Sequence, residues 1–126
     1  MSGEERQKFE RMLSDSRLAF GSDWFVAPPT PLEGIYAAVT RRTLDDRNAG
    51  GWVPEEKITV EEALRAYTVD AAHASFDEER KGTLAPGRLA DFVMLDRNLF
   101  EIAADDIRRV RVLLTVVGGR AVVERF

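Results

Sequence analysis

Apolar residues recur at helical spacing in the first third of the chain. Residues 2–5 have the spacing of a capping box, and apolar residues follow at positions 9, 12 and 13. Further along, Thr30 precedes Pro31, Glu33 stands at the reciprocal capping position, and an apolar stripe runs through positions 32, 35, 36 and 39. We therefore predict a short amphipathic helix at the amino terminus and a second helix over residues 31–42.

A third helix is predicted after a long polar stretch. Residues 43–57 show no periodicity, which indicates a long surface loop, and such loops are often functional. Thr59 and Glu62 then repeat the capping-box spacing, and apolar residues recur at positions 63, 64, 67 and 71. We expect this helix to end around residues 73–75, before a charged hinge over residues 77–80.

The last third of the chain has the pattern of β-strands. Residues 92–95 and 110–117 are apolar and partly β-branched, and Gly118-Gly119 is a two-residue hairpin signal. Pro86-Gly87 predicts a tight turn, of type II if the glycine has a positive φ. The change from helix-rich to strand-rich sequence near Glu78 predicts an α+β chain whose parts are residues 1–77 and residues 78–126.

Composition narrows the possible functions. The chain has 126 residues, of which 44% are hydrophobic and 32% charged, and it has no cysteine, so disulfides, thiolate metal sites and cysteine nucleophiles are excluded. A net charge of −4 without a basic stripe argues against nucleic acid or an anionic membrane as the partner. The longest apolar stretch, residues 112–117, is far too short to span a membrane, and the absence of a hydrophobic signal core favours a cytoplasmic location.

Asp23 is the strongest candidate for a catalytic residue. Residues 18–20 form a brief apolar run closed by Gly21-Ser22-Asp23, which predicts a buried strand whose carboxyl end opens into a turn. An acid just past the end of such a strand stands where α/β folds concentrate their active-site groups. The alternative is an aspartate that satisfies backbone donors within its own turn. His73, the only histidine, cannot build a multi-histidine zinc site and is expected to interact with the end of its helix.

Several other side chains allow two interpretations. Trp24 and Phe25 could form a pocket wall, although the core is the more frequent place for aromatic residues beside a strand. Trp52 could act as a lid or a partner contact, although packing over the seam between the two parts of the chain is the role that we favour. Arg41 and Arg42 could grip an anionic substrate, but arginines at a helix end also complement the helix dipole, and we favour this second role.

Five segments in this order resemble the carboxyl-terminal portion of the amidohydrolase superfamily, in its family-3 (YtcJ-like) branch. Leu-Ala-Phe-Gly-Ser-Asp-Trp at 18–24 and the segments at 31–42 and 59–64 are similar to the end of the barrel of those enzymes. Residues 81–95 resemble the segment that leaves the barrel for a small β domain, and residues 112–123 resemble the closing hairpin. Phe25 departs from the pattern, because relatives usually have proline there.

The resemblance implies a fold and a chemistry. The family has a metal-dependent β/α barrel and a small β-sandwich, and it hydrolyses amide-like carbon-nitrogen bonds, here of a small-molecule substrate. Asp23 would match the catalytic aspartate after the last barrel strand, a residue of the metal site that contacts the metal-bound water and carries its proton to the leaving group. A divalent metal, with zinc expected, lowers the pKa of its water, and a nearby carboxylate can then transfer the proton.

The length of the chain limits how much of such an enzyme it can contain. A complete β/α barrel takes about 250 residues, and the other metal ligands of the family have no counterpart here. We therefore expect a fragment of a larger hydrolase that covers the last barrel strand, its following helices and part of the β-sandwich, and that is inactive and binds no metal by itself. The exposed flanks of its strand predict a homo-oligomer. The alternative is a free-standing noncatalytic module for association or regulation.

Overall fold

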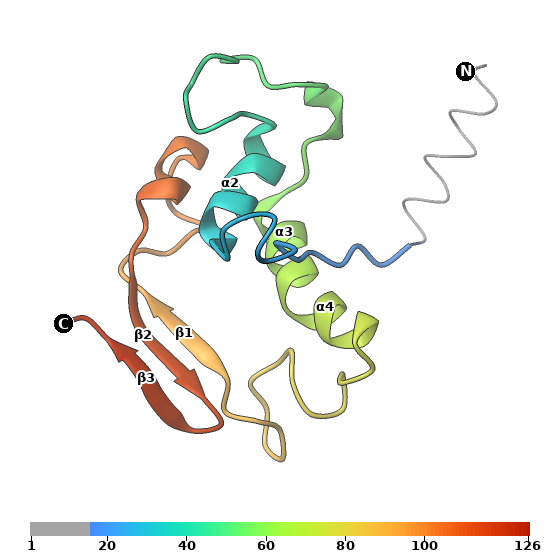
Figure 1. Ribbon diagram of the computed structural model, residues 1–126, viewed down its shortest axis with the longest axis vertical. Coiled ribbons are helices and arrows are strands. Elements are labelled where there is room, and N and C mark those ends of the chain that lie inside the picture. Colours follow the sequence, from blue (N-terminus) through green and yellow to red (C-terminus); the bar gives the residue numbers. More distant parts are fainter. Residues whose placement is uncertain (1–15) are drawn as a thin grey trace.

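A computed structural model describes residues 16–126 as helices on one side of the molecule and a small sheet on the other (Figure 1). The helix predicted at the amino terminus lies outside these residues. Within residues 16–126, no helix has both the length and the apolar character needed to cross a membrane. The elements in chain order are α2 (Pro31–Thr40), η1 (Pro54–Glu56), α3 (Val60–Tyr67), α4 (Val69–Ala74), β1 (Phe92–Leu95), η2 (Ala104–Arg109), β2 (Val112–Val117) and β3 (Arg120–Glu124).

The two predicted helix starts differ in how they are capped. At α3 the capping box is complete, because the Thr59 hydroxyl accepts a hydrogen bond from the Glu62 N–H and the Glu62 carboxylate accepts one from the Thr59 N–H. At α2 Pro31 occupies the first turn as predicted, but the Thr30 hydroxyl donates to the Glu33 carboxylate at 2.6 Å and caps no backbone N–H. The preset φ of proline is therefore the stronger start signal for α2.

The third predicted helix is two helices. Thr68, with φ −121° and ψ −87°, separates α3 from α4, and its hydroxyl donates to the Leu64 carbonyl at 2.7 Å. A threonine that bonds the carbonyl four residues back bends a helix, which explains a break that the apolar spacing did not reveal. The end at Ala74 agrees with the predicted end around residues 73–75.

The strands form an antiparallel sheet in the order β1-β2-β3, as the pattern of the last third predicted. Val117 pairs with Arg120 across Gly118 and Gly119, whose φ values of 56° and 79° give the hairpin turn the positive angles that glycine adopts without strain. Gly87 has φ 85° and the Arg88 N–H donates to the Ala85 carbonyl, so the turn at Pro86 is confirmed and its angle fits type II.

Two polar side chains hold the segment before the sheet. The Arg88 guanidinium donates to the carbonyls of Glu78 and Lys81, closing the turn that follows α4. The Asp91 carboxylate accepts the Gly118 N–H at 2.6 Å, which ties the start of β1 to the tip of the β2–β3 hairpin. The basic and acidic residues around Gly82 and Gly87 are therefore structural.

The hydrophobic core joins the helices to η2. Six buried residues form it: Ile35, Tyr36, Ala63, Leu99, Ile107 and Val110. Residues before and after position 77 contribute to this one cluster, and Figure 1 shows η2 beside α2. The described residues thus form an α+β fold around a shared core.

The predicted strand at residues 18–20 is absent from the structure. These residues have no regular structure, Leu18 is 46% exposed, and the Phe20 N–H donates to the Ala66 carbonyl of α3 instead of to a strand. A strand needs a neighbour for its backbone hydrogen bonds, and no other segment within residues 16–126 pairs with this one. The core position predicted for Trp24 and Phe25 is also wrong, because their side chains are 69% and 85% exposed.

Candidate functional site

Asp23 stands at the head of an exposed turn over residues 23–26. Its backbone has φ 51°, in the left-handed region that aspartate tolerates better than most residues, and its carbonyl accepts the Val26 N–H at 2.7 Å. The carboxylate is exposed and has no hydrogen-bond or ion-pair partner within residues 16–126. The alternative in which the Asp23 side chain satisfies backbone donors of its own turn is therefore wrong.

The backbone just before Asp23 is fixed on α3. The Phe20 N–H donates to the Ala66 carbonyl at 2.9 Å, and the Phe20 ring meets the Tyr67 ring edge to face with centroids 5.2 Å apart. The Tyr67 hydroxyl lies against Gly34 of α2, and burial raises the pKa of this hydroxyl. Asp23 therefore follows an anchored residue by three positions and precedes α2 by eight.

Replacing Gly34 with alanine tests this anchor. The added Cβ would lie 1.9 Å from the Tyr67 hydroxyl oxygen, so the ring must move. Overpacking costs about 1–3 kcal/mol and the helix propensity of alanine returns about 1 kcal/mol, so we expect the free energy of unfolding to fall by about 1 kcal/mol. Urea unfolding measures the change. In a Tyr67→Phe background the same substitution should cost less, and an equal cost there would contradict the contact.

The residues that follow Asp23 form an open apolar surface. Trp24, Phe25 and Val26 are all more than two-thirds exposed, and the peptide bond between Trp24 and Phe25 is cis. Their exposure shows that no other described segment covers these side chains. The turn therefore presents one acid beside three solvent-facing apolar side chains.

The described residues do not assemble a metal site around Asp23. Across residues 16–126 there is no group of three or more histidine, aspartate or glutamate side chains that could hold an ion. His73 lies in the last turn of α4, as expected, but its Nδ1 is 3.0 Å from a Glu78 carboxylate oxygen and it makes no contact with Asp23.

Arg41, which ends α2, contacts Trp52 within the long loop. Arg41 ends α2 in the left-handed conformation, its Nε donates to the Trp52 carbonyl at 3.1 Å, and its guanidinium lies 5.1 Å from the centre of the Trp52 ring. Trp52 remains 69% exposed, so it does not pack into a seam within the described residues. The contact joins the end of α2 to Trp52 in the loop.

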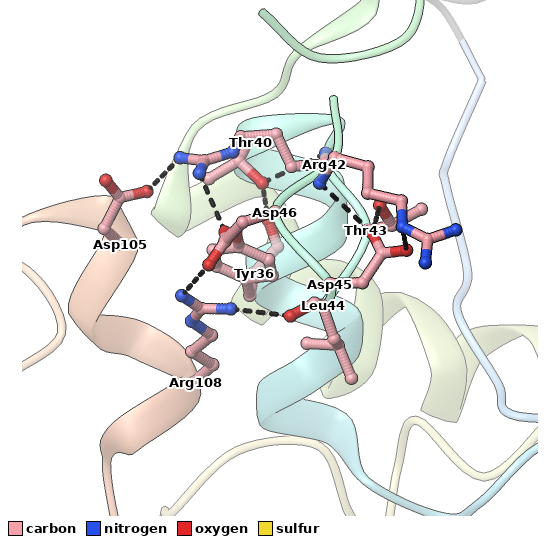
Figure 2. A network of polar contacts seen from close by, with 10 residues as sticks. Tyr36, Thr40, Arg42, Thr43, Leu44, Asp45, Asp46, Asp105 and Arg108 are labelled. Atoms are coloured by element: carbon pink, nitrogen blue, oxygen red, sulfur yellow. Dashed lines mark hydrogen bonds and ion pairs between the residues drawn. The ribbon is translucent and has the colours of Figure 1, made fainter. Parts of the chain in front are cut away.

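Arg42 belongs to an ion-pair network that fixes the same loop to η2. Figure 2 shows the Asp46 carboxylate between two guanidinium groups, 2.8 Å from Arg42 and 2.7 Å from Arg108. Arg42 also pairs with Asp105 of η2, and Arg108 donates to the Leu44 carbonyl at 2.9 Å. The guanidinium groups of Arg42 and Arg108 are thus engaged within the chain. Helix α2 ends at Thr40, so Arg42 lies outside the last turn of the helix, and the predicted interaction with the helix dipole would require it to lie inside that turn.

Acid is expected to loosen this network and destabilise the fold. The Arg108 hydrogen bond holds the pKa of Asp46 below its ordinary value of 3.8, and hydrogen bonds from Arg111 do the same for Asp96. The folded state therefore binds fewer protons than the unfolded state in this range, so its extra stability is present above about pH 4 and is lost as the pH falls below it. Urea unfolding at pH 7, 4 and 3 measures the loss, and Asp46→Asn should make it smaller. A free energy of unfolding that rose toward pH 3 would contradict this.

The comparisons with known proteins show the family of the chain. The model of the amidohydrolase family matches residues 7–123, and the chain belongs to that family. It is 40% identical over 92% of its length to Protein LONG AFTER FAR-RED 3 of Arabidopsis thaliana, and 36% identical over 82% to N-substituted formamide deformylase of Arthrobacter pascens. It is also 31% identical over 98% of its length to YtcJ of Bacillus subtilis (strain 168), so the predicted resemblance is confirmed.

The matches cover only part of each relative. The chain spans 20%, 18% and 24% of the lengths of these three proteins, respectively. No solved structure matches the chain. The family is therefore shown for residues 7–123.

Proposed function

We propose that this chain is a part of a metal-dependent hydrolase that cleaves amide-like carbon-nitrogen bonds of a small molecule. The family match over residues 7–123 supports this, as does the name of the Arthrobacter relative, a deformylase of N-substituted formamides. The chain supplies the end of the barrel and part of the small β domain. It is inactive without the remaining part of the fold.

Asp23 is the residue proposed to carry the proton. The observation that supports the role is its carboxylate, which is exposed and without a partner in residues 16–126, on a turn anchored by Phe20. Such a carboxylate can accept a proton from the attacking water and give it to the nitrogen of the leaving group, so that one proton enters and leaves the side chain in each cycle. An aspartate whose carboxylate accepted hydrogen bonds from its own turn could neither accept this proton nor donate it.

A divalent metal, zinc in this proposal, would require ligands from outside the described residues. Within them no three or more histidine, aspartate or glutamate side chains lie together, and catalytic zinc usually takes three protein ligands. The chain alone should therefore retain no stoichiometric zinc after dialysis and should not hydrolyse N-substituted formamides. Tight zinc binding or turnover by the isolated chain would contradict the proposal.

A chimera tests the function directly. The corresponding fifth of the Arthrobacter deformylase is replaced by this chain, and the hydrolysis of an N-substituted formamide is measured. We expect the chimera to retain turnover, whereas a deformylase that lacks the segment should have none. A folded chimera that binds metal but has no activity would contradict the proposal that this chain supplies the functional end of the barrel.

An association module is the second candidate function. It is favoured by the exposure of Trp24, Phe25 and Val26, which leaves a row of apolar side chains uncovered in the described part of the chain. In this role the chain would bind through its surface and carry out no chemistry.

A further inference from the structure

The segment that carries Asp23 is held at its two ends. Residues 21–29 are mostly exposed, and no hydrogen bond joins them to a part of the described chain beyond Thr30. The hydrogen bond from the Val26 N–H to the Asp23 carbonyl closes the turn itself, but it does not fix the position of the turn on the molecule. That position therefore depends on Phe20 before the segment and on α2 after it.

The side chain of Tyr67 touches both ends of this segment. On one side its ring meets the Phe20 ring edge to face, with centroids 5.2 Å apart and an interplanar angle of 70°. On the other side its hydroxyl lies against Gly34 of α2 and leaves no room for a Cβ there. Figure 1 shows the blue segment before α2 beside α3, the helix that carries Tyr67. One side chain thus contacts the chain before and after Asp23.

Tyr67 is itself held in place by the fold. It is the last residue of α3, it is half-buried, and it packs against the core cluster. The preceding residue, Ala66, is fully buried, and its carbonyl accepts the Phe20 N–H at 2.9 Å. The end of α3 therefore supplies both a backbone contact and a ring contact to the residue that begins the exposed segment.

We propose that Tyr67 is a positioning residue, which holds Asp23 in place for the proton transfer by contacting both ends of its segment. The inference rests on the proposed function of Asp23, and it does not require Tyr67 to touch the substrate or the reacting atoms. A displacement of about 1 Å in a reacting group can lower a rate about a hundredfold. A segment attached only at its ends is displaced when the side chain between those ends is removed.

A double-mutant cycle in the deformylase chimera tests the positioning role. We expect Tyr67→Ala to lower kcat about ten- to a hundredfold and to leave KM within about twofold, because the substitution impairs proton transfer and not substrate binding. In combination with Asp23→Asn, Tyr67→Ala should lower kcat by less than about twofold, because the group that it positions has lost its function. Tyr67→Phe keeps the ring contact with Phe20 and should retain kcat within about threefold.

Ile107→Val is the control for a general loosening of the core. Ile107 belongs to the same cluster but lies on η2, and its variant should keep kcat within about twofold, because the anchor of the segment is intact. If Tyr67→Ala fails to fold, Phe20→Ala removes the same ring contact from the other side, and the same cycle applies. Full kcat in Tyr67→Ala, or the same loss with and without Asp23→Asn, would overturn the proposal.

Hydrogen exchange of the isolated chain separates this inference from the proposed function. The Phe20 N–H reports on the anchor, and the Ala63 N–H, bonded to the Thr59 carbonyl at 3.0 Å, reports on α3 itself. Tyr67→Ala should accelerate exchange about tenfold more at Phe20 than at Ala63. Equal acceleration at both amides would overturn the positioning role, even if Asp23→Asn abolishes turnover. An Asp23→Asn chimera with full activity would instead overturn the proposed function, whatever the exchange at Phe20.

Discussion

Asp23→Asn in the deformylase chimera is expected to lower kcat by a factor of about 10²–10⁴, the usual contribution of a positioned general acid–base group. Asparagine keeps the shape of the side chain but cannot take up and release a proton at neutral pH. Because the Asp23 carboxylate makes no hydrogen bond or ion pair with the described residues, the substitution should leave the folded structure unchanged. Steady-state kinetics measures the loss.

A matched acid elsewhere serves as the control for Asp23. Glu61 is exposed on α3, and Glu61→Gln removes one negative charge from the same part of the chain. Its kcat should stay within about twofold of the unmodified chimera, because a solvated surface charge contributes little to a distant reaction. Full activity of Asp23→Asn, or an equal loss in both variants, would contradict the proposed role.

Ile107→Ala is expected to lower the free energy of unfolding by about 2–5 kcal/mol. Ile107 is fully buried on η2 and belongs to the cluster that joins η2 to α2 and α3, so truncation leaves a cavity at the centre of the fold. Ile107→Val should cost only about 0.5–1.5 kcal/mol, because a single methylene group is removed. Urea unfolding of the isolated chain measures both values.

The control for Ile107 lies on the sheet. Val122 is 57% exposed, and Val122→Ala should change the free energy of unfolding by no more than about 0.5 kcal/mol. If Ile107→Ala were equally mild, the cluster of Ile35, Tyr36, Ala63, Leu99, Ile107 and Val110 would not be the core of the protein.

Signals contained within a few residues predicted the fold well. The capping box at Thr59, the proline at the start of α2 and the glycine pair of the β2–β3 hairpin each act through neighbouring backbone atoms, and each element is where the sequence places it. The strand at residues 18–20 was wrong for the opposite reason. A short apolar run predicts only that its side chains are buried, and it does not reveal which segment covers them. In this structure Phe20 packs on α3.

The candidate site, too, could be predicted only from signals contained within a few residues. Position after an apolar run was enough to single out Asp23, and the resemblance to a family gave it a role that remains a prediction. Nothing local relates Asp46 to Arg108, which are 62 residues apart, so the network that fixes the long loop could not be predicted from the sequence. The ion pairs of Arg42 and Arg108 attach this loop to η2.

The shared core has a consequence for how the chain unfolds. Because Ile35 and Ala63 pack in the same cluster as Leu99 and Val110, neither half can keep its apolar side chains out of water once the other is removed. A nick between α4 and β1 should therefore give two pieces that melt together while associated and are largely unstructured when separated. We therefore expect unfolding to be cooperative across the hinge at residues 77–80.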